Sequence, residues 1–190
     1  MKGKITETSI SLFGQKGFKE TSIQEIVDHL GLTKGTFYYY FKNKEEVLVQ
    51  IHERFIDDLL EKQEKILKSS LRPEEKLREL VRMMIENIRA SVNSAMIFFR
   101  EMRHLSEGKL LYVRQKRDLF QQNIEKLVQE GIEEGAFRTD LRADMISYFI
   151  LGMANWSYFW YEPEGEVSEE HLADIYTAIL LQGLESKEKE

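Results

Sequence analysis

Hydrophobic side chains recur three and four positions apart along almost the whole chain, which is the spacing of one face of an α-helix. No stretch alternates apolar and polar residues convincingly over the length of a strand, and prolines occur only at Pro73 and Pro163. We therefore predict an all-α fold. The first part of the pattern predicts three short helices, over about residues 5–16, from about 21 to Gly31, and from Thr33 through the aromatic run that follows.

Longer amphipathic segments follow the three short helices. The sequence "NKEE" at 43–46 is typical of a helix start, and Pro73 begins another helix with acidic residues in its first turn. The pattern predicts helices over about 43–69, from Pro73, and over about 93–105, 107–134, 142–161 and 168–185. We therefore expect a small head, residues 1–47, joined to a larger helical body, residues 48–190.

The second and third short helices have the features of a helix-turn-helix. Thr21 or Ser22 can form a capping box with the side chain three residues later, and Thr33 can cap the third helix. Gly31 lies in the short connection between the two helices. Two short helices joined by about four residues that include a glycine form the helix-turn-helix arrangement.

Five consecutive aromatic residues, 37–41, follow the third helix start, with lysines on both sides. Successive helical residues differ by about 100°, so the five rings cannot all face one core. Phe37 and Phe41 are four apart and can be buried together, which leaves Tyr38, Tyr39 and Tyr40 around the sides.

The first turn of the third helix has the properties of a DNA-contacting element. Its free N–H groups and positive dipole end suit a phosphate, and a recognition helix presents its N-terminal residues to base edges. Lys34 can donate to guanine, Thr36 can contact a thymine methyl, and Gly35 lets the backbone approach closely. A plain corner of the core with a solvated rim stays an alternative for single residues such as Tyr39, but the whole stretch favours DNA binding.

Charge is distributed unevenly along the chain. The net charge is −6, yet the first 50 residues hold seven lysines against six carboxylates, whereas the remaining 140 hold 20 basic and 27 acidic side chains. Phosphate would repel the acidic body, so we expect DNA contacts only in the head.

The N-terminus lacks the apolar core of a signal peptide, and the apolar run at 145–161 is short and interrupted by polar residues. These features predict a cytoplasmic protein without a membrane partner.

The sequence gives little support to the hypothesis that the protein is an enzyme. The four histidines are far apart, no cysteine is present, and no glycine-rich phosphate loop occurs. We expect no catalytic residues, no metal and no cofactor. An acidic helical enzyme and a helical adaptor that binds only proteins remain the two alternatives.

The motif "LF..KGF..TSI..I" followed by "LG.TKGTFYYYFKNKEEVL" resembles the N-terminal domain of TetR-family transcriptional regulators, over residues 5–48. The resemblance implies a ligand-responsive regulator, most often a repressor, that dimerises through an all-helical C-terminal domain and binds a palindromic operator. By position, it implies base contacts from Lys34, Gly35 and Thr36, and phosphate contacts from Thr21 or Ser22, Tyr38, Tyr40 and Lys44. Thr33 and Tyr39 complete the DNA-binding set that we predict.

The body contains two apolar helices near its end. The last helix, 168–185, has apolar or small residues at Leu172, Ile175, Tyr176, Ile179, Leu180, Gly183 and Leu184, and the preceding helix, 142–161, is apolar almost all round. We expect these helices to form a four-helix interface of a homodimer, because two-fold symmetric half-sites need a two-fold symmetric reader. The alternative is the ordinary core of a monomer.

Six of the seven methionines lie in the body together with many aromatic residues, which suits an apolar effector pocket, although plain core is the alternative. Arg100 and Arg103 can bind an anionic head group, or else pair with Glu101 or Glu107. "FFREMRHL" and "LGMANWSYFWYEPEG" are similar to TetR-family members that respond to acyl-CoA-type lipids. We predict an acyl-CoA or fatty metabolite as effector, lined by Met84, Phe98, Phe99, Arg100, Met102, Arg103, Tyr112, Phe120, Phe149, Met153, Trp156 and Trp160.

Overall fold

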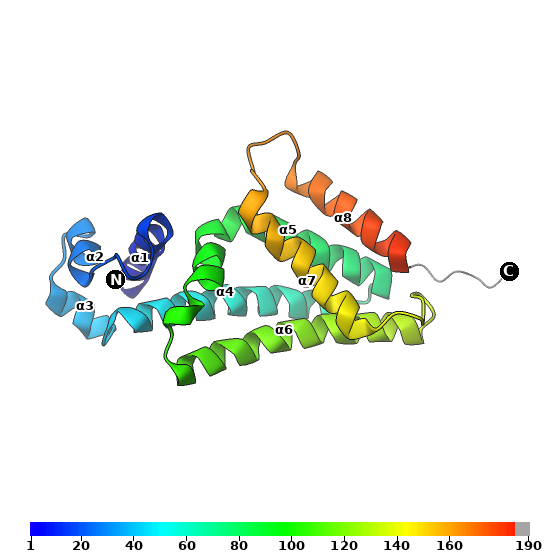
Figure 1. Ribbon diagram of the computed structural model, residues 1–190, viewed down its shortest axis with the longest axis horizontal. Helices are drawn as coiled ribbons and strands as arrows, with labels where there is room; N and C mark the ends of the chain where they lie inside the picture. The colour runs from blue at the N-terminus through cyan, green and yellow to red at the C-terminus, as the bar shows by residue number, and fades with distance from the viewer. Residues whose placement is uncertain (185–190) are drawn as a thin grey trace. The chain divides into compact units, whose positions relative to one another are not determined.

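The computed structural model describes residues 1–184, except for the side chain at position 90, and its regular elements are all helical (Figure 1). This confirms the predicted all-α fold. The α-helices are α1 Lys2–Lys16, α2 Ile23–His29, α3 Lys34–Tyr40, α4 Lys44–Leu67, α5 Pro73–Arg100, α6 Glu107–Glu133, α7 Ala143–Trp160 and α8 Glu169–Leu184, with a 3-10 helix at Met102–His104. Position 185, the expected end of the last helix, and the rest of the predicted body up to 190 lie outside the described residues.

Local side-chain chemistry sets the bounds of the helix-turn-helix. The Ser22 hydroxyl accepts from the Glu25 N–H at 3.2 Å, and the Glu25 carboxylate accepts from the Ser22 N–H at 2.8 Å, which completes a capping box. Thr33 caps α3 by accepting from the Thr36 N–H at 3.3 Å. Gly31 ends the α2 region with φ +62°, a conformation that glycine adopts without strain.

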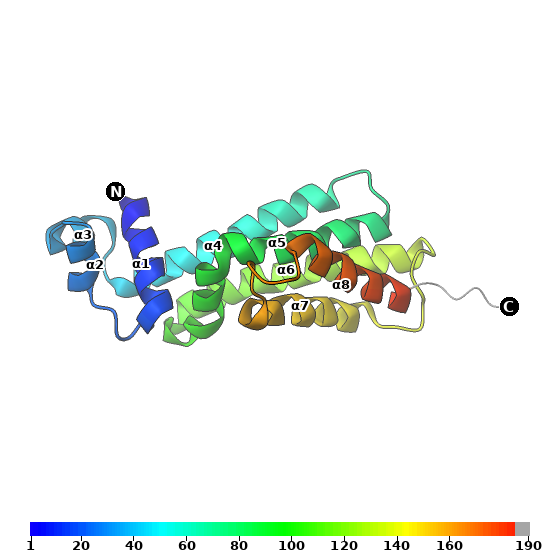
Figure 2. The same ribbon diagram turned by 90° about the horizontal axis from the view of Figure 1, so that it is seen from above.

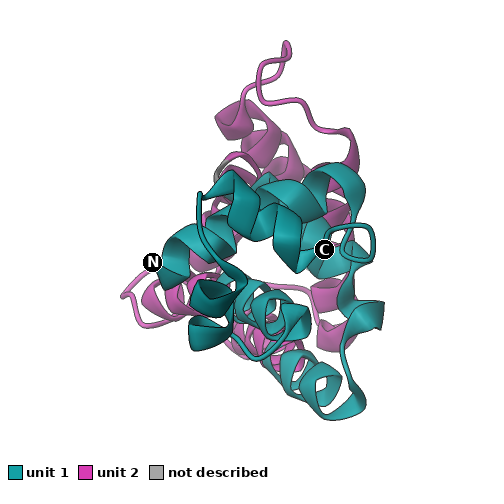
Figure 3. Cartoon of the chain, turned by 90° about the vertical axis from the view of Figure 1, so that its left-hand side faces the viewer, with its two compact units in different colours: residues 1–57, 91–116 teal, residues 58–90, 117–190 magenta. Residues whose placement is uncertain are grey.

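The chain forms two compact units, each discontinuous in sequence (Figure 3). Unit 1 comprises residues 1–57 and 91–116, and the described part of unit 2 comprises residues 58–90 and 117–184. Helices α4, α5 and α6 each contribute residues to both units. The predicted division after residue 47 stays a prediction.

Each unit has its own hydrophobic core. In unit 1, Ile5, Ile26, Val27, Phe37 and Leu48 are fully buried. Unit 2 buries residues of α5, α6 and α7, among them Leu80, Ile88, Ile124, Val128 and Ile150. In unit 2, helices α7 and α8 run antiparallel side by side, and the Ser157 and Tyr176 hydroxyls are 2.9 Å apart (Figures 1 and 2).

Helix α5 is interrupted where the sequence predicted a new helix at about 93. Ser91 has φ −139° and ψ 17°, and helical geometry resumes after it as far as Arg100. Serine and asparagine side chains compete for backbone hydrogen bonds, and Ser91, Asn93 and Ser94 lie together at this point. The predicted helix over 93–105 is therefore the second part of α5 followed by the 3-10 helix.

A close approach in unit 2 requires glycine within α6. A Cβ atom at Gly131 would lie 2.3 Å from the Phe137 ring and 3.1 Å from the Pro73 Cβ, and Phe137 is only 1% exposed. The backbone turns back at this point, since the Phe137 N–H donates to the Gly131 carbonyl at 3.0 Å.

We predict that Gly131→Ala destabilises the protein, whereas alanine usually stabilises a helix interior relative to glycine. Displacing a fully buried ring costs about 1–3 kcal/mol of unfolding free energy, which exceeds that gain. Gly108→Ala, in the same helix, is the matched control because its Cβ would meet nothing within 4 Å. Thermal unfolding measures both variants, and a Gly131→Ala melting temperature at or above that of Gly108→Ala would contradict the packing argument.

Candidate nucleic-acid interface and effector site

The five aromatic residues of α3 and its C-cap divide between core and surface. Phe37 is 0% exposed and Phe41 3%, and their ring centroids lie 5.7 Å apart, which confirms that they are buried together. Tyr38 is 53% exposed and Tyr39 82%. Tyr40 is half-buried, and its ring meets that of Tyr39 edge-on at 4.9 Å. One side of the short helix therefore presents phenol rings to solvent.

The first turn of α3 is exposed and held by its two threonines. The Thr33 and Thr36 hydroxyls are 3.2 Å apart, and Thr33 also caps the helix. Lys34 and Gly35 between them are exposed. The turn therefore presents a lysine side chain and an uncovered stretch of backbone.

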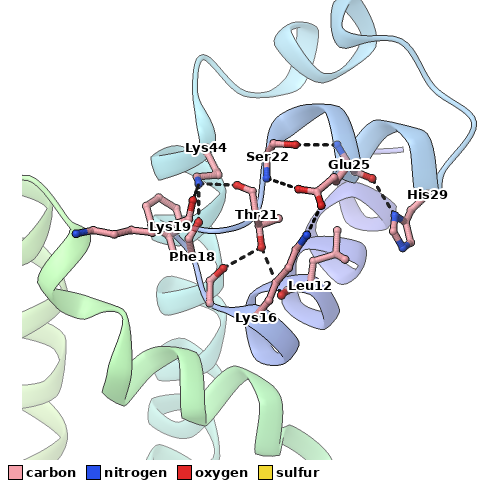
Figure 4. A network of polar contacts seen from close by, with 10 residues as sticks. Leu12, Lys16, Phe18, Lys19, Thr21, Ser22, Glu25, His29 and Lys44 are labelled. Carbon is pink, nitrogen blue, oxygen red and sulfur yellow. Dashed lines mark hydrogen bonds and ion pairs between the residues drawn. The ribbon is translucent and has the colours of Figure 1, made fainter.

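The residues before α2 have different environments (Figure 4). Ser22 is exposed, and its hydroxyl is engaged in the capping box. Thr21 is fully buried, and its hydroxyl donates to the Gly17 carbonyl at 2.9 Å. Of the two residues predicted as alternatives, only Ser22 has a surface position.

The ammonium group of Lys44 is engaged within the protein. It donates to the carbonyls of Phe18 at 2.5 Å, Lys19 at 3.2 Å and Thr21 at 2.6 Å, and it lies 4.4 Å from the centre of the Phe18 ring (Figure 4). Burial lowers the pKa of Lys44, although Glu20 and other nearby carboxylates favour its charged form. Lys44 therefore fastens the start of α4 to the segment that leads into α2.

A second cation joins α1 to α2. Lys16 donates to the Glu25 carboxylate, whose other oxygen closes the capping box with Ser22. The hydrogen bonds from Lys16 and Ser22 lower the pKa of Glu25 to about 2. Glu25 is therefore ionised near neutral pH, and its two oxygens hold α1 and the start of α2 together.

The residues predicted to bind an effector fall evenly between the two units. Phe98, Phe99, Arg100, Met102, Arg103 and Tyr112 belong to unit 1, and Met84, Phe120, Phe149, Met153, Trp156 and Trp160 belong to unit 2. In unit 1, Phe98 is 3% exposed and meets Phe99 edge-on at 5.6 Å, while Arg100 and Arg103 are exposed. Tyr112 is exposed, and the centre of its ring lies 4.8 Å from the Lys116 ammonium. The same ammonium pairs with the Asp57 carboxylate at 2.6 Å.

In unit 2, Met84 and Phe120 are buried and Met153 is half-buried. Phe149, Trp156 and Trp160 are instead on the outer side of α7, and Trp156 is 65% exposed. An open groove of about 430 Å³ runs between α7 and α8. Its lining is Leu141, Arg142, Met145, Ile146, Phe149, Ile179, Leu180, Gly183 and Leu184.

Sequence reasoning missed His52, which is fully buried in α4. Neither of its ring nitrogens has a hydrogen-bond partner among the residues that the structure describes, and burial lowers its pKa to about 4. The ring meets that of Phe98 edge-on at 5.3 Å. One histidine among apolar helix positions forms no motif, so the sequence offered no signal for it.

Sequence reasoning also missed the contacts of the segment after α5 with the first helices of unit 1. The rings of His104 and Phe18 stack with centroids 5.6 Å apart. The Glu45 carboxylate accepts from the Ser106 N–H at 2.6 Å and pairs with Lys109 at 3.4 Å, and the Ser106 bond lowers the pKa of Glu45. The segment from Glu101 to Lys109 thus stacks on the α1–α2 turn and is hydrogen-bonded to the start of α4.

Residues 1–184 contain neither a metal-binding cluster nor a membrane-spanning helix. No group of three histidine or acidic side chains there could hold a metal ion. Within the same range, no helix is both long enough and apolar enough to cross a membrane.

Comparisons with known proteins cover nearly the whole chain. Residues 5–51 match the model described as "Bacterial regulatory proteins, tetR family", and residues 70–184 match "Tetracyclin repressor-like, C-terminal domain". The HTH-type transcriptional repressor KstR2 of Mycolicibacterium smegmatis is 30% identical over 182 residues, which cover 95% of this chain and 89% of the relative.

Two solved structures share the fold. The ketosteroid transcriptional regulator KstR2 of Mycobacterium tuberculosis superposes with a TM-score of 0.89 at 28% identity and covers 98% of this chain and 95% of its own. AibR, in complex with isovaleryl coenzyme A and operator DNA, gives a TM-score of 0.86 at 25% identity, over 95% and 97% of the two chains. The fold, the capped helix-turn-helix and these matches together identify the chain as a member of the TetR family of DNA-binding transcriptional regulators, which are not enzymes.

Proposed function

We propose that the protein is a homodimeric repressor that leaves a palindromic operator when an acyl-CoA or a similar amphipathic metabolite binds to its body. The observation that carries this proposal is the exposed surface of α3, where Lys34 and two tyrosines surround a capped helix start. Such a surface suits the major groove, whose base edges and flanking phosphates require donors. As a DNA-binding regulator of transcription, the protein acts in the cytoplasm.

We assign the base contacts to Lys34, Gly35 and Thr36, in the first turn of α3. The phosphate contacts then fall to residues at its rim: Ser22, Thr33, Tyr38, Tyr39 and Tyr40. Thr21 and Lys44 support the DNA-contacting residues indirectly, because their polar groups donate hydrogen bonds to the protein's own backbone carbonyls. Lys44 holds the segment before α2 in place and thereby sets the orientation of α3.

The outer face of α7 supports the homodimer. Along it, 50% of Met145, 57% of Tyr148, 65% of Trp156 and 48% of Trp160 are exposed, and on α8 59% of Ile179 is exposed. Monomeric proteins rarely leave so many contiguous large apolar side chains in water. A second copy would cover this face, and the groove between α7 and α8 with it. Two copies also place two α3 helices on one duplex, about 34–36 Å apart in a helix-turn-helix dimer.

The acyl-CoA class is supported by the AibR complex, which contains isovaleryl coenzyme A. Unit 1 offers apolar and aromatic side chains at Phe98, Phe99 and Met102 beside the exposed Arg100 and Arg103. Apolar groups next to guanidinium groups suit an acyl chain joined to phosphates. Movement of α4, whose start is bonded to the segments around Phe18 and Ser106, would carry the response to α3.

Lys34→Ala should reduce the preference for the operator over sequences altered at one base pair, because a base contact of this kind is worth about 1–3 kcal/mol. Fluorescence anisotropy with operator variants measures the preference. Lys126→Ala, an exposed lysine of α6, is the control and should leave the operator affinity unchanged. An undiminished preference in Lys34→Ala would remove Lys34 from the base-reading set.

Trp156→Glu should convert the dimer to a monomer, since it places a charge in the proposed interface. Operator affinity should then fall about 100-fold or more, because the second half-site is no longer bound by a linked copy. The control is Leu119→Glu, which adds the same charge at a 46% exposed leucine of α6. Sedimentation equilibrium reports the mass, and a Trp156→Glu variant that stays dimeric would refute the interface.

Isovaleryl-, lauroyl- and stearoyl-CoA test the effector class. An effector of this class should weaken operator binding about 5- to 150-fold, the usual range of allosteric coupling, and should raise the melting temperature of the free protein. Coenzyme A alone is the control for the nucleotide part. If all three thioesters leave both quantities unchanged, the effector belongs to another class.

A further inference from the structure

His52 carries two buried polar atoms that have no hydrogen-bond partner in the described part of the chain. The side chain is 0% exposed, and neither ring nitrogen forms a hydrogen bond. A buried polar group left unpaired costs about 1–3 kcal/mol, so native proteins usually supply a partner from the chain, from water or from a ligand. For His52 residues 1–184 supply none, which leaves water or a ligand.

The imidazole of His52 contacts the aromatic ring of Phe98. Its ring lies edge-on to Phe98 at 5.3 Å, and Phe98 in turn contacts Phe55 at 4.9 Å and Phe99 at 5.6 Å. We call Phe55, Phe98 and Phe99 the aromatic cluster. The cluster and His52 together combine an apolar surface with one donor and one acceptor, which is the usual make-up of a small-molecule site.

The electrostatic environment selects a neutral partner. Burial alone lowers the pKa of His52 to about 4, and no charged side chain of the described chain contributes to the shift. The ring is therefore neutral near pH 7, with one nitrogen as donor and the other as acceptor. A carboxylate placed here would be a buried charge beside a neutral imidazole, whereas a carbonyl oxygen is much cheaper to remove from water.

Phe98, whose ring meets that of His52, lies on a segment whose two ends depart from α-helical geometry. Phe98 and Phe99 belong to the second part of α5, which is separated from the first by the non-helical Ser91. At its other end α5 gives way to the 3-10 helix Met102–His104. The segment is thus bounded by a non-helical residue at one end and by a change to 3-10 geometry at the other, and kinks of this kind separate a helix into parts.

We propose that His52 donates a hydrogen bond to the acyl carbonyl oxygen of the effector, and that the acyl chain packs against the aromatic cluster. This inference rests on the proposed function and names the polar anchor of its effector site. Occupancy displaces the segment that carries Phe98, and the same segment continues to His104, stacked on Phe18, and Ser106, bonded to Glu45. Binding at His52 thereby alters the support of the α1–α2 turn and of the start of α4.

The test compares two ligands that differ by one oxygen atom. Lauroyl-CoA carries the thioester carbonyl, and S-dodecyl-CoA is the thioether without it. Wild-type protein should bind the thioester about tenfold more tightly than the thioether. This ratio corresponds to the free energy of one buried hydrogen bond. His52→Phe keeps the ring packing but lacks both nitrogens, so it should bind the two ligands with equal, thioether-like affinity.

Gln50→Leu is the matched control. Gln50 also lies in α4, and its side-chain oxygen is likewise buried without a hydrogen-bond partner in the described residues. It is two residues from His52 and therefore points to another side of the helix. It should keep the preference of wild-type protein for the thioester. Isothermal titration calorimetry measures all six pairs of protein and ligand.

Ligand-free stability provides a second measurement. If His52 awaits an external partner, His52→Phe removes an unmet polar group and should melt at or above the wild-type temperature. A clearly lower melting temperature would mean that bound water already satisfies His52, and would overturn the inference. So would a thioester preference that survives in His52→Phe.

The outcomes separate this inference from the proposed function. Release of the operator by lauroyl-CoA in both wild type and His52→Phe, with equal potency, would overturn the role of His52 and leave the repressor intact. Operator binding without any acyl-CoA affinity would overturn both the acyl-CoA effector and the role of His52. Absence of operator binding would remove the repressor function itself.

Discussion

The hydrogen bonds from the Lys44 ammonium to the carbonyls before α2 are the interaction on which the DNA-facing part of the structure depends. Three carbonyls converge on one cation, and their donor lies 23 to 26 residues further along the chain. The adjoining Phe18 ring adds a cation–π contact at 4.4 Å. Because this segment leads directly into the capping box of α2, Lys44 fixes where the helix-turn-helix begins relative to α4 (Figure 4).

The residues around the Lys44 ammonium also contact the segment after α5. Phe18, beneath the Lys44 ammonium, stacks on His104, and Glu45, next to Lys44, accepts from the Ser106 N–H. Residues 91–116 accordingly belong to the same compact unit as the helix-turn-helix (Figure 3). These contacts join that segment to the α1–α2 turn and to the start of α4, the helix that follows α3. A two-state element biased by both a ligand and DNA is what allosteric coupling requires.

The features that the sequence predicted well are local. Ser22 and Thr33 cap their helices as spacing suggested, and Phe37 and Phe41 are buried together because residues four apart share a helical face. The partners of Lys44 lie too far along the chain for any spacing rule, so its internal role was missed.

Solvent exposure and unmet hydrogen bonds are likewise invisible in a linear pattern. Helix α7 is apolar almost all round, so only packing reveals that Trp156 faces outward and Ile150 faces the core of unit 2. His52 is the same case: its two unpartnered nitrogens become evident only when every neighbouring group has a position. Tertiary contacts decide these features, and the sequence pattern does not encode them individually.

Amide hydrogen exchange tests the central claim, that α3 and the segment 101–109 respond as one unit to DNA and effector. The account predicts that operator binding slows exchange in Lys34–Tyr40 and in 101–109 together, and that lauroyl-CoA reverses both changes. Protection of α3 by the operator with unchanged exchange in 101–109 would contradict it.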